Sequence, residues 1–285
     1  MLRFALALAL ALPLVPAATA APAMWKVSDD NSAIYLFGSF HVLPKGIEWR
    51  TPLFDERLAA ADRIVFETDL SPLAQASVGA AAIARGIYVD GTLLTDAIGP
   101  DLEAALRAQS STYSVPVGTL LAMRPWMAAN TISVAAMMSL GYDQPGVELQ
   151  IAPQIEPERF MHLETGEEQL DVLAGAPDEE QIAMLEATLS ELDALPKIMS
   201  KMVSHWQSGT AEQIAHLFQM EMGGFEEAFL DRLLYQRNRN WIAPLSELLN
   251  DDLDALVIVG AAHLVGPGSV VELLEDRGYT ATRLQ

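Results

Sequence analysis

One short pattern occurs twice in this chain of 285 residues, near its two ends. An apolar run over 33–37 leads into Gly38 and, after two further residues, His41; a second run over 255–259 leads into Gly260 and His263 in the same way. Glycine after a strand allows a sharp turn because it has no Cβ atom. A chain that repeats the same strand and Gly-x-x-His turn is expected to bring the two histidines together. The repeat therefore predicts one site, with a metal site as the working hypothesis.

Short apolar runs of β type gather at both ends of the chain. The expected strands are 24–27, 33–37, 63–67, 255–259 and 279–284. The first two flank a Ser-Asp-Asp-Asn cluster, which predicts a β-hairpin. A helix opened by Pro52 separates the second strand from the third, and this strand–helix–strand order favours parallel pairing. A helix over 268–277 precedes the last strand.

The middle of the chain, roughly 73–250, has a mostly helical pattern. The expected helices are 73–85, 101–108, 126–140, 147–155, 168–174, 179–206, 211–221 and 225–249, with one strand at 159–163 among them. Pro196 should kink or break one long helix, and Pro244 should bend another. These elements predict an α/β (α+β) fold in a single domain, 21–285. Its central sheet is built from the N- and C-terminal portions, and a large helical insertion covers one side.

Composition narrows the classes of partner. The formal net charge is −21 and no cluster of Lys and Arg is found, which excludes a nucleic-acid partner. The chain has no cysteine, so disulfides, thiol nucleophiles and thiolate ligands are excluded. A metal would have to be held by nitrogen and oxygen atoms. A peptide or small-molecule substrate remains the expected partner, and the sequence does not fix an oligomeric state.

Residues 1–20 have the pattern of a secretory signal. Arg3 precedes an apolar run over 4–15, and Ala18 and Ala20 give the small-x-small end that predicts cleavage after Ala20. A buried helix or a membrane anchor is the alternative, but the run is short for a membrane span. No second span is expected. The mature protein is therefore expected to be exported, to the periplasm or beyond, with no membrane span.

Three residues with useful chemistry follow expected strands. His41, Glu67 and His263 each come directly after such a run, and ligands of open α/β sheets bind beyond the carboxyl ends of strands. Neutral imidazole binds Zn, Mn, Fe or Co and also serves as a general base. Glu67 could complete a metal site, act as the base, or form a salt bridge with Arg237. The alternative for both histidines is a loop or core position with local hydrogen bonds.

Other polar residues carry less specific signals. By spacing alone, Arg237 and Asn238 lie on the polar face of an amphipathic helix. Glu148 is interpreted as a first-turn carboxylate favoured by the helix dipole, and Thr165 and Glu168 as a capping box. A core or surface position is favoured for the remaining histidines, His162, His205 and His216.

Six stretches together resemble the TraB/PrgY/GumN family, which includes the Tiki metalloproteases. They are 35–41 (YLFGSFH), 65–67 (VFE), 146–150 (GVELQ), 163–169 (LETGEEQ), 236–241 (QRNRNW) and 259–266 (VGAAHLVG), and they follow the family's order across nearly the whole mature chain. The resemblance is closest to the exported, GumN-like bacterial branch. It implies one active centre formed by the paired Gly-x-x-His motifs and a glutamate, assisted by an Arg-Asn pair. By position these are His41, His263, Glu67, Arg237 and Asn238.

The resemblance implies a metal-dependent hydrolase, with a peptide as the expected substrate. His41, His263 and Glu67 would hold a divalent ion of the Mn or Co type, with Zn or Fe as further options, or Glu67 would act as the base. Arg237 and Asn238 would hold the substrate carbonyl or the developing oxyanion. Two alternatives stay open: a non-catalytic protein that binds haem or a peptide, and a metal-independent ester hydrolase.

Overall fold

A computed structural model describes residues 20–221 and 227–285. The expected signal segment lies outside these residues, apart from Ala20. The main sheet has six strands in the order β6-β4-β7-β2-β1-β8, and β3 and β5 pair in a small second sheet. The strands are β1 (Met24–Ser28), β2 (Ala33–Ser39), β3 (Val42–Leu43), β4 (Arg63–Phe66), β5 (Gln144–Pro145), β6 (Phe160–His162), β7 (Ala255–Gly260) and β8 (Thr280–Arg283). Neighbours β6, β4, β7 and β2 run parallel, whereas β1 is antiparallel to both β2 and β8.

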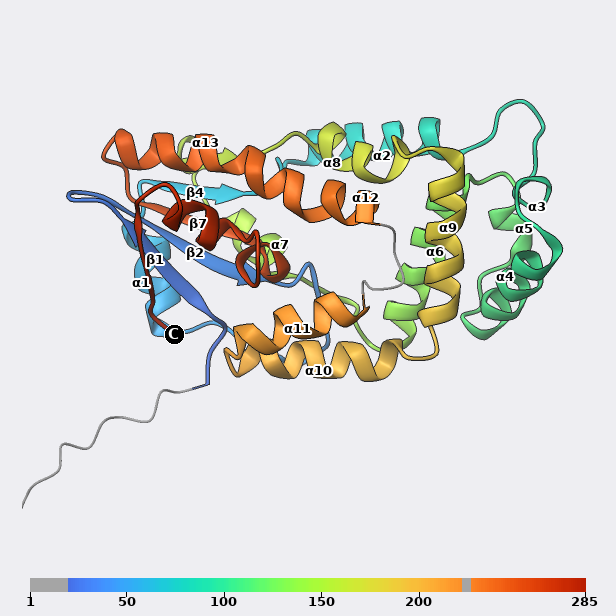
Figure 1. Cartoon of the computed structure of the whole chain (residues 1–285), viewed down its shortest axis with the longest axis horizontal. Helices are drawn as coiled ribbons and strands as arrows, with labels where there is room; N and C mark the ends of the chain where they lie inside the picture. Colours follow the sequence, from blue (N-terminus) through green and yellow to red (C-terminus); the bar gives the residue numbers. More distant parts are fainter. Residues whose placement is uncertain (1–19, 222–226) are drawn as a thin grey trace, which may run out of the picture.

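Helices cover both faces of the sheet and form a separate helical part (Figure 1). The α-helices are α1 (Pro52–Ala60), α2 (Pro72–Gly86), α3 (Leu94–Ala97), α4 (Pro100–Thr112), α5 (Val117–Leu120), α6 (Pro125–Ser139), α7 (Val147–Ile151), α8 (Gly166–Ala174), α9 (Asp178–Glu191), α10 (Leu195–Gln207), α11 (Ala211–Glu221), α12 (Glu227–Leu230), α13 (Gln236–Asn250) and α14 (Val270–Glu275). Short turns of other pitch are η1 (Ala152–Gln154), η2 (Pro157–Arg159), the π-helical η4 (Asp231–Tyr235) and η5 (Ala261–Leu264).

Local sequence explains where several helices begin. Thr51 and Ser71 accept hydrogen bonds from the backbone N–H groups of the first turns of α1 and α2, and proline follows each of them. The expected capping box at the start of α8 is present: Thr165 and Glu168 each accept from the other's backbone N–H. These caps satisfy donors that a helix leaves unpaired at its N-terminus.

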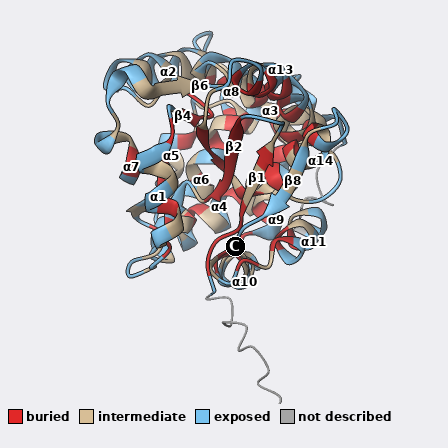
Figure 2. Cartoon of the chain, turned by 90° about the vertical axis from the view of Figure 1, so that its left-hand side faces the viewer, coloured by how far each residue is buried: buried red, intermediate tan, exposed pale blue. Residues whose placement is uncertain are grey.

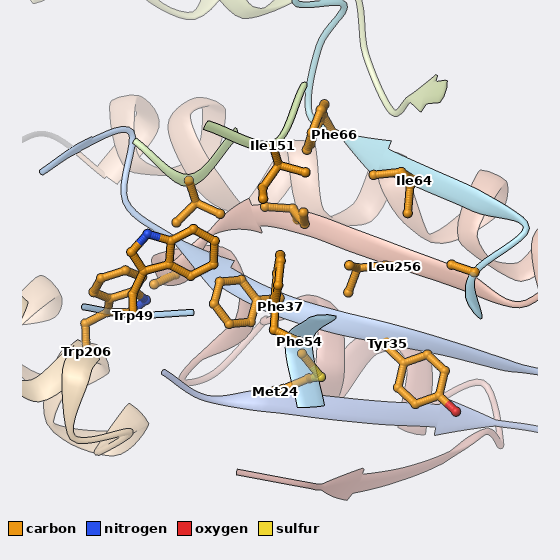
Figure 3. Packing of buried hydrophobic residues seen from close by; sticks show 14 of the residues in the cluster. Met24, Tyr35, Phe37, Trp49, Phe54, Ile64, Phe66, Ile151, Trp206 and Leu256 are labelled. Carbon is orange, nitrogen blue, oxygen red and sulfur yellow. The ribbon is translucent and has the colours of Figure 1, made fainter. Parts of the chain in front are cut away.

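The central strands β2 and β7 are buried on both faces, and their side chains alternate between two cores (Figure 2). On one face, Phe37 of β2 packs against Trp49 and Phe54, and Trp206 of α10 closes the cluster (Figure 3). On the other face, Leu36 and neighbouring strand residues pack under α13 and α14. A third core lies within the helical part, where side chains of α3, α4, α5, α6, α8 and α9 pack together.

The expected α/β architecture is confirmed, because β1 and β2 come from the N-terminal portion of the sheet and β7 and β8 from the C-terminal one. Strand 159–163 of the middle region is β6, at the sheet edge. The two strands of the expected strand–helix–strand unit are β2 and β4. They run parallel, as predicted, but they do not pair with each other because β7 lies between them. The division into one domain with a helical insertion stays a prediction. No helix in the described residues is both long and apolar enough to cross a membrane.

The sequence predicts effects of two prolines on the helices. The break expected near Pro196 is confirmed, because α9 ends at Glu191 and α10 begins at Leu195, with Pro196 in its first turn. Pro244 lies inside α13, which continues through it, and the bend expected there stays a prediction; the departure from α-helical pitch is η4, upstream of the proline. The expected start of that helix, 225–226, lies outside the described residues. The sequence analysis missed α3, α5 and the β3–β5 pair, which are all short.

Trp206 offers a first test of how the sheet is tied to α10. Its indole is buried and Nε1 donates a 2.7 Å hydrogen bond to the backbone oxygen of Gly38. We expect Trp206→Phe to lower the free energy of unfolding by about 2 kcal/mol, because a buried carbonyl loses its donor and a small void remains. Urea unfolding measures this. Trp25→Phe, at a partly exposed position, is the control and should change stability by less than about 1 kcal/mol; an equal loss in both variants would contradict the expectation.

Candidate active site

The four parallel strands end at one edge of the sheet, and a polar residue follows each end. In the order of the sheet these are Glu164 after β6, Glu67 after β4, His263 after β7 and His41 after β2. Figure 1 shows this edge facing the helical part of the molecule. His41, Glu67 and His263 therefore meet as the carboxyl-end rule predicts. Glu164, which the sequence analysis assigned no role, joins them.

Glu67 occupies the middle of the site. It is 5 % exposed, and its Oε1 accepts the backbone N–H of Gly260 at 2.7 Å. Oε2 accepts from Arg237 Nη2 at 2.6 Å and from Gln169 Nε2 at 2.9 Å. Burial raises the pKa of Glu67, but the charges of His263, His41 and Arg237 and the Gly260 N–H outweigh it and lower the pKa to about 2. Glu67 is therefore a carboxylate at neutral pH.

The site packs closely around Gly260. A Cβ at this position would lie 3.3 Å from Glu67 Oε1, which is tight, and 3.5 Å from His41 Nε2, which is an ordinary van der Waals contact. A side chain here would therefore press on the carboxylate. The second Gly-x-x-His motif thus provides a backbone donor for Glu67 as well as the turn that carries His263.

His263 is held by Asn238. Its Nδ1 lies 2.6 Å from Asn238 Oδ1, while the Asn238 amide group donates to Gly268 O at 2.8 Å. The Asn238 oxygen can only accept, so Nδ1 carries the proton and Nε2 presents a lone pair. That lone pair faces Arg237 Nη1 at 3.1 Å. Burial lowers the pKa of His263 to about 3 against the opposing charge of Glu67, so this ring is neutral.

His41 is held by Glu148. Its Nδ1 lies 3.0 Å from Glu148 Oε1, and this carboxylate also accepts a hydrogen bond from the hydroxyl of Ser39. Glu148 is buried, whereas 62 % of the His41 side chain is exposed toward a cavity. Desolvation lowers the pKa of His41, but the hydrogen bond and charge of Glu148 and the charge of Glu67 raise it to about 9. Solvent screens part of this effect because the ring is exposed.

A close backbone contact brings Glu148 to His41. Gly146 N donates to His41 O at 3.1 Å, and Val147 N donates to Phe40 O at 3.2 Å. A Cβ on Gly146 would lie 2.2 Å from Phe40 O, so only glycine permits this approach. The first turn of α7 then points Glu148 at the imidazole. The sequence analysis treated Glu148 as an ordinary first-turn carboxylate; the glycine two residues earlier was the available signal.

Arg237 joins the two carboxylates on this side of the site. Nη2 donates to Glu67 and to Glu164, Nε donates to Glu164 at 3.0 Å, and Nη1 contacts Leu233 O and His263 Nε2. The five N–H donors of a guanidinium are thus all engaged. The salt bridge between Glu67 and Arg237, one of the alternatives for Glu67, is present at 2.6 Å.

This geometry changes the roles expected of Arg237 and Asn238. Both were expected to hold a substrate carbonyl or oxyanion. Asn238 is 0 % exposed and uses its amide on His263 and Gly268, so it orients His263 instead. Arg237 lines a cavity but would have to release a present partner before it could donate to a substrate.

The donor chemistry of the centre fits a metal ion, although the spacing is wide. Nε2 of His41 and Nε2 of His263 each lie 3.9 Å from Glu67 Oε1. Bonds of about 2.0–2.1 Å in a tetrahedral site place ligand atoms about 3.4 Å apart. Among residues 20–221 and 227–285, no three histidine or carboxylate side chains are close enough to hold an ion as they stand. Each imidazole nevertheless has its Nδ1 bound to an oxygen acceptor, the usual arrangement for a histidine ligand.

The other histidines lie outside this centre. His162 is exposed on β6, and His216 is exposed on α11. His205 Nδ1 pairs with the hydroxyl of Thr210 at 2.8 Å. A cavity of about 730 Å³ opens onto His41, Glu67, Glu148 and Arg237 and extends between β4 and helices α2 and α8.

Comparison with known proteins identifies the family of this chain. No curated protein and no solved structure matches the chain significantly. The model of the TraB/PrgY/gumN family matches residues 23–283, which include His41, Glu67, Glu148, Arg237 and His263. The match spans nearly all of the chain. The chain therefore belongs to the TraB/PrgY/gumN family.

Proposed function

We propose that this chain is a metal-dependent hydrolase that acts on peptides. One observation carries the proposal: two imidazoles, each with Nδ1 fixed by an oxygen acceptor, turn Nε2 toward the same buried carboxylate oxygen at 3.9 Å. Imidazole Nε2 atoms and a carboxylate are the donor set that Mn, Co, Zn or Fe accepts; His263 is neutral, and His41 would release its proton to the solvent when the ion binds. The pattern of residues 1–20 supports an exported protein, in which this activity would lie outside the cytoplasm.

His41, His263 and Glu67 would hold the ion, and Asn238 and Glu148 would orient the two rings. When bound, a divalent ion polarises a carbonyl and lowers the pKa of a bound water. Alternatively, the two histidines would hold the ion and Glu67, which remains ionised at neutral pH, would act as the base that takes a proton from a water. His41 is the exposed member of the centre and faces the large cavity, so a substrate would approach the centre from its side.

The main test measures metal binding and cleavage together. Purified protein would be stripped with a chelator and titrated with Mn²⁺, Co²⁺, Zn²⁺ and Fe²⁺, and metal content determined by mass spectrometry. We expect about one ion per chain, and at least 100-fold weaker binding in His41→Ala, His263→Ala and Glu67→Gln because each loses a ligand. His162→Ala, an exposed histidine on β6, is the matched control and should bind like the wild type.

Equal metal content in the wild type and all three site variants would contradict the metal assignment. So would cleavage of a peptide library that is unchanged by chelation. If His162→Ala loses metal binding as the three site variants do, the ion binds adventitiously at the surface, and the assignment of His41, His263 and Glu67 as ligands is contradicted. Circular dichroism of each variant establishes that folding is retained.

A second candidate is a metal-independent ester hydrolase, and two observations favour it. Arg237 Nη1 lies 3.1 Å from the lone pair of His263 Nε2 that an ion would need. Glu148 and Glu67 raise the pKa of His41 to about 9, which suits a general acid, although desolvation opposes them. Ester hydrolysis that survives exhaustive chelation and is lost in His41→Ala would select this candidate over the first.

A further inference from the structure

Two cavities border the active centre and share part of their lining. The larger has a volume of about 730 Å³ and is lined by Glu67 but not His263; the smaller has about 260 Å³ and is lined by His263 but not Glu67. His41, Leu233 and Arg237 line both. The candidate metal ligands therefore lie where the two cavities meet. A molecule bound across this point would extend in two directions from the reacting bond.

The smaller cavity is apolar away from the centre. Phe40, Met202, Phe218 and Leu234 form its wall together with the methyl groups of η5. Met202 of α10 and Phe218 of α11 have large apolar side chains, yet both are only partly buried. Its volume accommodates one side chain of the size of leucine or phenylalanine, which gains free energy by leaving water.

The larger cavity has a mostly apolar surface, with three carboxylates among the side chains that line it. Glu67, Asp69 and Glu148 line it, and Arg237, one of its cations, is already shared between carboxylates. Asp69 lies three residues beyond the end of β4 and is partly exposed. Its Oδ1 accepts the backbone N–H of Ser71, and no ion pair to Asp69 occurs within the described part of the chain. A cationic group entering this cavity would meet an unneutralised carboxylate.

We propose that the substrate is an extended peptide cut at an internal bond, with an apolar side chain in the smaller cavity and a basic side chain beside Asp69 in the larger one. This inference rests on the proposed hydrolase function. In the reaction the C–N bond breaks, the hydroxyl of water joins the carbonyl carbon, and the released amine takes the proton. Glu67 lines only the larger cavity and His263 only the smaller one. A substrate bound between these two residues would therefore extend on both sides of the cleaved bond.

The experiment uses internally quenched fluorescent peptides of ten residues with Mn²⁺ present. The central bond is flanked by Lys and Leu in both orders, and matched peptides carry norleucine for Lys or Gly for Leu.

Replacing Lys should lower kcat/KM about fivefold in the wild type and have no effect in Asp69→Asn. Replacing Leu should lower kcat/KM at least tenfold. Phe218→Ala should shift the preference from Leu toward Trp, since it enlarges the smaller cavity. Asp143→Asn, exposed and outside both cavities, should keep the wild-type pattern.

The outcomes separate this inference from the proposed function. Cleavage restricted to the terminal residue, or a Lys preference unchanged in Asp69→Asn, overturns the inference and leaves the hydrolase in place. Metal-free protein would also be titrated with the labelled Lys-Leu peptide by fluorescence anisotropy. Binding that weakens in both Asp69→Asn and Phe218→Ala, without any cleavage, supports the two side-chain subsites but overturns the hydrolase and, with it, cleavage at an internal bond. Neither binding nor cleavage overturns both.

Discussion

Arg237→Met is expected to destabilise the protein by about 3–5 kcal/mol, the cost of leaving buried charges without their partner. Arg237 lies between Glu67 and Glu164, and its Nη2 approaches one oxygen of each at 2.6 Å. All three side chains are at most 10 % exposed, so water cannot replace the guanidinium. Methionine fills a similar volume, and the loss therefore measures charge and hydrogen bonding more than packing. Urea unfolding at neutral pH gives the difference.

Arg239→Met is the matched control, because Arg239 lies two residues further on α13 and pairs with Asp231 at the surface. Exposed ion pairs contribute little, so this variant should lose less than about 1 kcal/mol. Adding Glu164→Gln to Arg237→Met should recover more than about 1 kcal/mol, since one uncompensated carboxylate is removed while Trp241 Nε1 keeps an acceptor. Equal losses in Arg237→Met and Arg239→Met would show that the buried pairs are not what stabilises this edge of the sheet.

The centre of the site could be predicted from the sequence because strand ends dictate it. Residues that follow parallel strands meet at one edge of the sheet, so His41, Glu67 and His263 could be expected together before their partners were known. The order of apolar runs and helical segments predicted the α/β class, and the turn residues at 28–31 predicted the hairpin. These patterns could not give the strand order, because the insertion of β7 between β2 and β4 depends on pairing across more than half of the chain.

The residues that orient the centre were out of reach for a different reason. Glu148 contacts Ser39 across a separation of 109 residues, and Glu164 contacts Arg237 across 73. A carboxylate in a first helical turn has the same local pattern whether it faces water or a histidine. Only the packed structure distinguishes the two. The π-helical η4, which precedes Arg237 and supplies the Leu233 carbonyl that it contacts, likewise has no local sequence signal.

Gly146→Ala is expected to cost about 3 kcal/mol and to release His41 from Glu148. The new Cβ would lie 2.2 Å from Phe40 O and 2.4 Å from His41 C and O, and these are backbone atoms that cannot rotate away. Overpacking of this kind typically costs about 1–3 kcal/mol, and a backbone clash lies at the upper end. The chain can relieve the clash only by moving α7 away from the segment after β2. That movement breaks the two backbone hydrogen bonds between these segments and withdraws Glu148 from the imidazole.

Gly118→Ala separates this local clash from a general intolerance of alanine. Gly118 lies in α5, and a Cβ there would have no atom within 4 Å, so the variant should be neutral or slightly more stable. The decisive readout is the His41 imidazole NMR signal, assigned with His41→Ala: it should shift in Gly146→Ala and in Glu148→Gln and stay fixed in Gly118→Ala. An unshifted signal in folded Gly146→Ala would mean that Glu148 follows His41 independently of the glycine contact. Because stability and imidazole position are measured separately, a loss of metal binding in Gly146→Ala could then be assigned to the lost orientation of His41 rather than to unfolding.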